Sequence, residues 1–366
     1  MRTGHSILTS WVLAVSLTGT PLQHSTHGSR GDRQPSPGVP LSLQIRAEPR
    51  SGRRGPQRRE SRAKGRAVPW IAPIAADGHV DLQGVWMNDS ATPLERPKQL
   101  EGRALLTDLE VAELQRRADR IFGSDDSDAG LGDNVFLAAL ADLDRYTSID
   151  ATSGALAVDR RVFDNRTSLI VDPADGRLPS YTPRGQARVD ALRHARADPP
   201  DDPESLPNYE RCLTDEVPRL VGGNRSFVSI VQTPDYVILT NEFIHEARVI
   251  PLRGTPHLAN DIRFWSGDSR GHWEKQTLVV DTINFTSLNN YLGSDENLHI
   301  VERFTRSGPL SIDYEITLDD PTVWTRSWTA MVHWKQTTSQ IYEDACHEGN
   351  YSVVDSLRGA RAQEKP

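Results

Sequence analysis

"LSIDYEITL", residues 310–318, alternates apolar and polar side chains over its whole length. Successive side chains of an extended strand point to opposite faces, so residues two apart share a face. One face of this strand is wholly apolar and carries Leu310, Ile312, Tyr314, Ile316 and Leu318. The other face is polar and carries Ser311, Asp313, Glu315 and Thr317. The stretch therefore predicts a β-strand with one buried side and one side in water.

Similar short strand patterns follow one another from about residue 220 onward, and turn sequences rather than helices separate them. The turn sequences are "TPD" (233–235), "LRGTP" (252–256), "EKQ" (274–276), "RSGP" (306–309) and "LDDPT" (318–322). Strands joined at hairpin spacing form an antiparallel meander. Because a long meander must protect its edges, we expect a mainly β fold that closes into a barrel or a barrel-like sandwich.

Two segments ahead of the meander have helical patterns. The first is "TDLEVAELQRRADRIF" (107–122), in which Thr107 and Glu110 stand at the spacing of a capping box. The second is "RGQARVDALRHARA" (184–197), which is shorter and less regular. We therefore expect one β-rich domain over residues 70–360, with a helical and loop insertion at about residues 100–200.

The N-terminal residues have the pattern of an export signal. Arg2 precedes an apolar run from Ile7 to about Leu17, and small and polar residues follow. This pattern predicts a secretory signal peptide over residues 1–25 and a periplasmic or extracellular protein. A mistaken start site would be the alternative explanation. Residues 26–69 are rich in Arg, Gly, Pro and Ser, so we expect a disordered basic linker, or else a tail that contacts nucleic acid or anionic surfaces.

Charge and cysteine content narrow the possible partners. The formal net charge is −8, with much of the positive charge in residues 50–66, which argues against a general nucleic-acid binder. No later stretch has the roughly 20 apolar residues that a membrane span needs. Cys212 and Cys346 lack the spacing of a zinc site, so export predicts a disulfide between them. Two buried free thiols are the alternative.

One resemblance concerns the ends of the meander. "DLQGVW" (81–86) supplies a G-x-W through Gly84 and Trp86, and "WTRSWTAMVHW" (324–334) places Arg326 between tryptophans. This combination resembles the lipocalin-like barrels, in which an arginine late in the chain packs over that tryptophan. The chain departs from that family in the long insertion between the two features.

A second resemblance covers nearly all of the chain after Trp70. It rests on "DGHVDLQGVW", "TPLERP", "RTSLIVDPADGRLP", "HEARVIPL", "GDSRGHWEKQTLVVDTINF", "ERFTR", "DDPTVWTRSWT" and "ACHEGNY". These motifs resemble those of a large group of uncharacterised secreted proteins of soil bacteria. The resemblance implies export and a single structural unit, and it assigns no catalytic residue.

Face assignment gives the candidate site. In residues 237–249 the odd positions form an apolar face that holds Asn241 and His245. Asp281 shares a face with Val279, Ile283 and Phe285, and Glu302 shares one with Leu298, Ile300 and Phe304. Arg326 falls on the face of Trp324 and Trp328. The loop residues Asp268, Arg270, His272 and Glu274 are instead interpreted as solvated turn residues, with Gly267 and Gly271 shaping the turn.

Buried charges need partners, so Asp281, Glu302 and Arg326 should meet on one interior surface. One interpretation is a purely structural ion-pair network. The other makes the set a cavity floor with His245, Asp281 and Glu302 as catalytic acid–base groups, and with Asn241, Arg326 and Trp328 as substrate-binding groups. A metal site would combine His245 with His257, His299 or His347, but no metal-binding spacing supports it, and no cofactor motif is present.

Three classes of function remain. The first is an exported enzyme, a lyase, isomerase or hydrolase, that performs acid–base chemistry on a small molecule in a barrel cavity. The second is a non-catalytic, lipocalin-like ligand-binding or carrier protein. The third is an accessory protein that acts through its surface. A solvent-connected pocket with a histidine and a carboxylate would favour the enzyme, and a dry apolar cup would favour the carrier.

Overall fold

The structure is a computed structural model that describes residues 70–122, 135–140, 161–197, 199–214, 217–218, 220, 227–288 and 291–364. The chain divides into two compact units, Met1–Pro56 and Gln57–Pro366, and all the described residues belong to the second. The expected signal peptide and basic linker lie outside the described residues.

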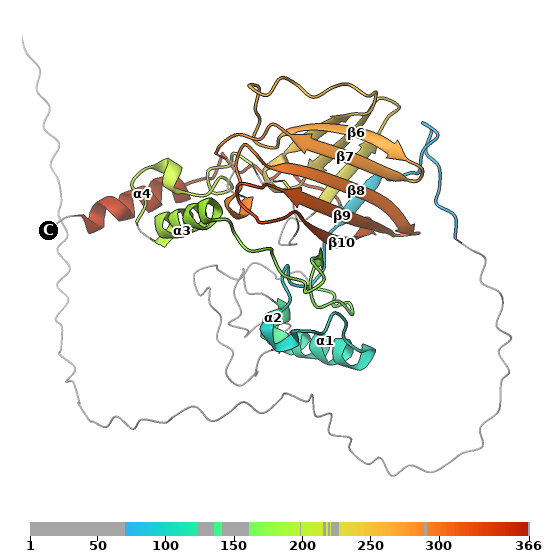
Figure 1. The fold of residues 1–366 in the computed structure, drawn as a ribbon, viewed down its shortest axis with the longest axis horizontal. Coiled ribbons are helices and arrows are strands. Elements are labelled where there is room, and N and C mark those ends of the chain that lie inside the picture. The colour runs from blue at the N-terminus through green and yellow to red at the C-terminus, as the bar shows by residue number, and fades with distance from the viewer. Residues whose placement is uncertain are drawn as a thin grey trace, which may run out of the picture. The chain divides into compact units, whose positions relative to one another are not determined.

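The described part is built on a ten-stranded antiparallel sheet, which confirms the prediction of a mainly β, antiparallel fold (Figure 1). Its strands are β1 Gly84–Met87, β2 Ile170–Asp172, β3 Phe227–Gln232, β4 Tyr236–Asn241, β5 Ala247–Pro251, β6 Asp268–Glu274, β7 Thr277–Ile283, β8 His299–Gly308, β9 Ser311–Asp319 and β10 Trp328–Thr337. The order across the sheet is β5-β4-β3-β1-β10-β9-β8-β7-β6, and β2 pairs with β10.

The first strand joins two halves of the meander. β1 pairs with β3 on one side, Trp86 opposite Val228, and with β10 on the other, Val85 opposite Thr337. On either side of β1 the chain follows the predicted hairpins, β3-β4-β5 in one half and β6 to β10 in the other. The N-terminal part of the folded region thus completes a sheet whose remaining main strands lie more than a hundred residues later.

The inner face of the sheet is filled by aromatic and aliphatic side chains. The Phe304 and Tyr314 rings stack with centroids 4.7 Å apart, and the Tyr314 and Trp334 centroids are 4.5 Å apart. Trp86 is fully buried and its Nε1 donates to the carbonyl oxygen of Leu82 at 2.9 Å. The alternation predicted for residues 310–318 is confirmed within β9, since residues 312, 314, 316 and 318 are all buried, whereas Leu310 lies in the turn before the strand and is exposed.

The two end strands, β5 and β6, approach each other without forming a strand pair in the described part of the chain. We call the line between them the seam. A Cβ on Gly271 of β6 would lie 2.7 Å from Leu252 Cδ2 and 2.9 Å from Ile250 Cγ2. Gly271 therefore allows the side chains at the end of β5 to reach the backbone of β6, and the sheet curls until its ends touch at this point.

The helices are α1 Asp108–Phe122, α2 Val135–Leu140, α3 Pro183–Ala197 and α4 Ser352–Gln363. The capping box of α1 is confirmed: Glu110 Oε2 accepts from the Thr107 backbone N at 2.9 Å, and Thr107 Oγ1 accepts from the Glu110 backbone N at 3.3 Å. α1 and α2 share a small core of their own that includes Leu114 and Phe136. The second predicted helix is also present, as α3.

The disulfide between Cys212 and Cys346 is present, with the two Cα atoms 5.8 Å apart and the two cysteines 134 positions apart in sequence. It joins the segment just before β3 to the segment that follows β10. Among the residues that the structure describes, none of the helices combines the length and the apolar character that crossing a bilayer requires.

Candidate functional site

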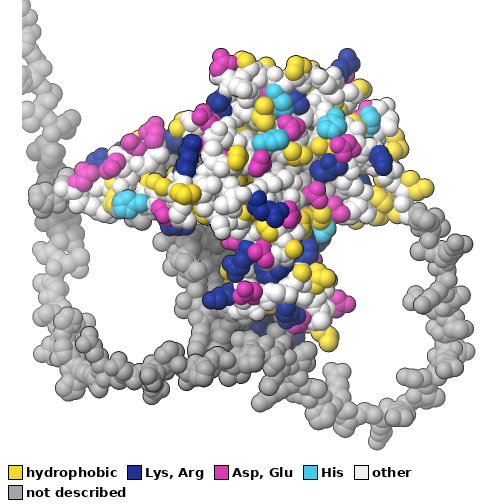
Figure 2. Space-filling model, in the orientation of Figure 1, with side chains coloured by type: hydrophobic (Ala, Val, Ile, Leu, Met, Phe, Trp, Pro, Cys, Tyr) yellow, Lys and Arg dark blue, Asp and Glu magenta, His cyan; other side chains and the backbone are white. Residues whose placement is uncertain are grey.

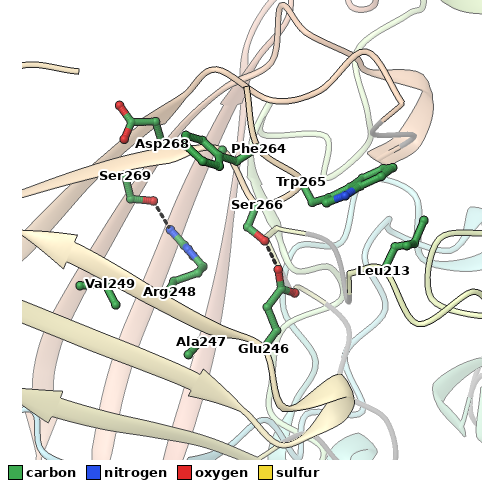
Figure 3. Close-up of a pocket in the computed structure, with 11 residues that line it drawn as sticks. Leu213, Glu246, Ala247, Arg248, Val249, Phe264, Trp265, Ser266, Asp268 and Ser269 are labelled. Atoms are coloured by element: carbon green, nitrogen blue, oxygen red, sulfur yellow. Dashed lines mark hydrogen bonds between the residues drawn. The ribbon is translucent and has the colours of Figure 1, made fainter. Parts of the chain in front are cut away.

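A pocket of about 340 Å³ opens to solvent along the seam (Figure 3). The strand β5 and the residue before it line one side with Glu246, Arg248 and Val249, and residues 264–269 line the other. Leu213 and Trp265 lie together at one end of this space in the close-up. We call it the seam pocket, and its volume lies at the small end of the range for ligand sites, about 300–1,000 Å³.

Arg248 reaches from β5 across the seam to the inner face of the opposite strands. Its Nη1 donates to Glu302 Oε1 at 3.1 Å, and its Nη2 donates to Glu302 Oε2 at 2.6 Å. Nη2 also donates to Ser269 Oγ of β6 at 3.0 Å. The Tyr314 hydroxyl donates to Glu302 Oε1 at 2.5 Å. We call these four residues, together with Thr282 beside Ser269, the buried arginine cluster.

The pair at the centre of this cluster is almost completely removed from water. Glu302 is 0% exposed and Arg248 is 9% exposed. Burial opposes the charge of Arg248, but attraction and hydrogen bonding to Glu302 outweigh burial and raise the pKa of the guanidinium. Burial, reinforced by the charge of Glu302, raises the pKa of Tyr314 well above its ordinary value, so that the hydroxyl keeps its proton and donates. The cluster is therefore charge-neutral and tightly hydrogen-bonded.

One donor of the cluster is not used. The Nε of Arg248 is buried and has no hydrogen-bond partner within the described part of the chain. A buried donor without an acceptor costs roughly 1–3 kcal/mol relative to a satisfied one. Because Arg248 lines the seam pocket, a ligand oxygen that enters the seam is one way to satisfy this donor.

A second polar cluster lies on the outer face of the sheet, where histidine and charged side chains gather over β6–β8 (Figure 2). His299 Nε2 contacts Asp281 Oδ2 at 2.7 Å. Asp281 Oδ1 contacts His257 Nε2 at 2.9 Å, and His257 Nδ1 contacts Asp268 Oδ2 at 3.0 Å. These four residues form the histidine–aspartate chain, a continuous line of hydrogen bonds from the half-exposed His299 to the buried Asp268.

The histidine–aspartate chain also fixes the loop between β5 and β6. His257 belongs to that loop, and the Leu258 backbone N donates to Asp268 Oδ2 at 2.9 Å. Arg270 donates through Nε to the Pro256 carbonyl oxygen at 3.0 Å and through Nη1 to Asp268 Oδ1 at 2.5 Å. The same loop continues into residues 264–266, which border the seam pocket. Contacts on the outer face therefore position one wall of the pocket.

The hydrogen bonds within the histidine–aspartate chain affect the charge states of His299 and Asp281. Both ring nitrogens of His257 face carboxylate oxygens. The hydrogen bond from His299 lowers the pKa of Asp281 despite partial burial. The hydrogen bond to Asp281 raises the pKa of His299, again against partial burial. The His299–Asp281 end therefore favours the charged pair.

Asp268 connects the outer cluster to the seam pocket, since it ends the histidine–aspartate chain and also lines the pocket. Its carboxylate points away from Arg248 and Ser266 in the close-up (Figure 3). Ser269, the next residue, faces inward and bonds Arg248. The alternation of β6 therefore places one functional group on each side of the sheet.

His245 does not lie on an inner face. It is exposed, and its Nδ1 contacts the carbonyl oxygen of Asp344 at 3.0 Å. The predicted face is wrong beyond residue 241, because the chain leaves the strand there in a turn in which Ile244 and His245 have φ values of 59° and 46°. β5 then resumes with Arg248 inward instead of Ala247. Asn241 ends β4, is partly buried and donates its backbone N to the Glu246 carbonyl oxygen at 2.9 Å.

Asp281 lies on the outer face, with its side chain 38% exposed, so its predicted position inside the sheet is wrong. β7 buries Leu278, Val280 and Thr282 on the inner side, but Val279 on the outer side is buried as well. Because β7 has buried apolar residues on both faces, its sequence pattern does not show which face is interior. The prediction that residues 268–274 form a turn is also wrong, since they form β6 and Asp268 is only 6% exposed, although His272 and Glu274 are exposed as predicted.

Glu302 is interior, as the alternation predicts, but its partner is Arg248. Arg326 is exposed and pairs with Asp172, Nη2 to Oδ2 at 2.5 Å, because residues 320–327 form a turn before β10 starts at Trp328. Trp328 is fully buried in the core and packs edge-on against Trp324. The arginine over Trp86 is Arg306, with its guanidinium carbon 5.0 Å from the ring centroid. The expected role of Arg326 in that contact is therefore wrong.

The predicted site residues thus do not form one cluster. Glu302 belongs to the buried arginine cluster and Asp281 to the histidine–aspartate chain, while His245, Arg326 and Trp328 belong to neither. Sequence reasoning missed Arg248 and named His257 and His299 only as possible metal ligands. Among the described residues, no group of three or more His, Cys, Asp or Glu is arranged to hold a metal ion.

No protein family model matches the chain, and no curated protein or solved structure matches it either. The function of the site is therefore argued from its geometry alone.

Proposed function

We propose that the protein is an exported ligand-binding protein that takes up a small molecule in the seam pocket. The observation that carries this proposal is the buried Arg248, which lines the pocket and has an unpaired Nε–H within the described part of the chain. A charged side chain held in place by Glu302 and Ser269 is preorganised to orient a ligand. The disulfide fits export, because such bonds persist in oxidising compartments.

A direct test is a thermal-shift screen of the full-length protein against a chemically mixed metabolite panel. A ligand at a hundred times its dissociation constant adds about 2.7 kcal/mol of stability, which a melting curve detects. The variant Ala247→Trp fills the pocket from an exposed position on β5, so it should abolish the ligand-induced shift and leave the melting temperature of the free protein nearly unchanged.

The matched control is Ala187→Trp on the exposed surface of α3, which should keep the ligand-induced shift. The proposal fails if the panel contains no binder, or if a binder shifts both variants equally.

A second candidate function is an enzyme that uses acid–base chemistry, a lyase, isomerase or hydrolase. The histidine–aspartate chain favours it, because a line of hydrogen bonds between solvent and a pocket wall can move protons. Against it, none of the described residues that line the pocket is a histidine, and the Asp268 carboxylate points away from Arg248.

Incubating each binder with the protein and following it by NMR separates the two candidates. The carrier leaves the ligand unchanged. An enzyme converts it, and Asp281→Asn should then lower the rate by roughly a hundred- to ten-thousand-fold while binding persists.

A further inference from the structure

The charges that line the seam pocket exclude two classes of ligand. Among the pocket-lining residues that the structure describes, Arg248 is the one cationic side chain, and both of its Nη atoms are already matched to Glu302. Glu246 and Asp268 are the other charged lining residues, and both are carboxylates. The Asp268 carboxylate points away from Arg248 and pairs with Arg270 (Figure 3). Among the described lining residues, an anionic ligand would therefore find no positive charge that is not already matched.

A cationic ligand is also poorly matched, because both carboxylates already accept hydrogen bonds. Asp268 accepts from His257, the Leu258 backbone and Arg270. Glu246 accepts from Thr214 Oγ1, at 3.1 and 3.0 Å to its two oxygens, and from the Ser266 hydroxyl. The pocket therefore favours an uncharged ligand that hydrogen-bonds to it.

The remaining polar groups of the described lining include both donors and acceptors. Ser266 and Ser269 bring hydroxyls, Arg248 brings its unpaired Nε–H, and Glu246 brings carboxylate oxygens. The seam-side backbone groups of β5 and β6 have no strand partner in the described sheet and add N–H and C=O groups. A ligand that matches such a mixture needs several groups that both donate and accept, which is the property of neighbouring hydroxyls.

Aromatic side chains supply the apolar part of the lining. Phe264 and Trp265 line the pocket, and Phe264 is 43% exposed, so its ring is accessible to a ligand. Trp265 is partly exposed and lies at the end of the pocket beside Leu213 (Figure 3). An aromatic face covers the carbon-bound hydrogens of a saturated ring well, while hydroxyls at the edge of that ring reach the polar groups.

We infer that the seam pocket binds an uncharged sugar residue, with its hydroxyls on Ser266, Ser269, Arg248 and Glu246 and one ring face against Trp265. This inference rests on the proposed ligand-binding function and adds the ligand class to it. The volume of about 340 Å³ accommodates one ring-sized ligand, and the opening along the seam leaves room for the rest of a glycan to project into solvent.

The test titrates the full-length protein with neutral methyl glycosides and disaccharides and follows tryptophan fluorescence and thermal shift. The matched probes are the corresponding uronates, which add one negative charge, and amino sugars, which add one positive charge. We expect the neutral sugars to bind and both charged probes to bind at least about tenfold more weakly. Trp265→Ala should weaken binding by about tenfold or more, whereas Trp70→Ala, at a 40% exposed tryptophan outside the pocket lining, should leave binding unchanged.

The outcomes separate the inference from the proposed function. If the metabolite panel yields a binder that Ala247→Trp excludes and no neutral sugar binds, the sugar assignment is overturned and ligand binding stands. If uronates bind more tightly than neutral sugars, the charge argument is overturned. If neutral sugars bind equally to the wild type and to Trp265→Ala, the assigned ring position is overturned. If nothing binds, both proposals fail.

Discussion

At the scale of single residues, the feature with the largest energetic consequence is the ion pair between Arg248 and Glu302. Removing one partner leaves the other as an uncompensated charge in the core, whereas an exposed ion pair contributes little because water screens it. This protein contains an example of a buried ion pair and an example of an exposed one. Arg248 is buried against Glu302, and Arg326 is exposed against Asp172.

We therefore expect Arg248→Ala to lower the free energy of unfolding by about 3–5 kcal/mol, because Glu302 would remain buried with only Tyr314 as a donor. Arg326→Ala is the control and should cost at most about 1 kcal/mol. Urea denaturation of the two variants measures the difference. Equal losses would show that the buried pair does not act as described.

The pair of His299 and Asp281 predicts a pH dependence of stability. The pKa of His299 is raised from 6.5, so its contribution is complete below pH 6.5 and is lost as pH rises through the raised value. The pKa of Asp281 is lowered from 3.8, so its contribution is present above pH 3.8 and is lost as pH falls through the lowered value. The pair should therefore stabilise the protein most between pH 3.8 and 6.5.

Melting curves of wild type and His299→Gln over pH 3–9 test this expectation. The difference between them should be largest inside that window and should amount to about 1 kcal/mol or less, because both side chains are about two-fifths exposed. His347→Gln, at an exposed histidine, is the control and should give a flat difference. A difference for His299→Gln that grows above pH 8 would contradict the assignment.

At the scale of elements, the contact between β5 and β6 depends on the absence of a side chain at position 271. A valine there would bring its Cβ to 2.7 Å from Leu252 Cδ2, closer than carbon atoms pack. We expect Gly271→Val to destabilise the protein by about 1–3 kcal/mol through overpacking. Gly359→Ala in α4, where a Cβ meets no atom within 4 Å, should be neutral or slightly stabilising.

Chemical denaturation of both glycine variants checks this expectation. If Gly271→Val is as stable as the wild type, β5 and β6 do not approach each other as closely as described.

The sequence predicts some strands better than others, and the reason is physical. β8 and β9 alternate cleanly, so the inward position of Glu302 and Tyr314 can be read directly. β6 carries only small or polar residues at 268–272, with Ser269 and Gly271 inward, so it lacks the apolar signal of a strand. In β5 the alternation restarts after a turn with positive φ, which no local pattern of side chains reveals. The inward position of Arg248 was therefore missed.

At the scale of the whole molecule, the partners that matter lie far apart in sequence. Arg248 and Glu302 are separated by 54 residues, and the disulfide by 134. The disulfide could be predicted because Cys212 and Cys346 are the only cysteines in the sequence and the N-terminal pattern predicts export. The pairing of Arg248 with Glu302 could not be predicted, because the sequence offers several charged residues as possible partners. The curvature of the sheet determines which of them reaches Glu302.

The disulfide should contribute strongly to global stability. By the chain-entropy model, closing a loop of more than a hundred residues restricts the unfolded chain by about 4–5 kcal/mol. Reduction should therefore lower the melting temperature by several degrees, and Cys212→Ser with Cys346→Ser should reproduce that loss. Calorimetry with and without reductant measures it. Two thiols that titrate in native, unreduced protein would contradict the bond.

The approach of β5 and β6 also bears on aggregation. A free strand edge is a template on which another chain can add, and natural sheets shield or shorten such edges. Here the two free edges of the described sheet face each other, so each leaves little room for an incoming strand from a second molecule. We expect Gly271→Val, which forces them apart, to aggregate well below its melting temperature, with a rise in light scattering that the wild type does not show. The closeness of the seam would then keep the protein monodisperse as well as folded.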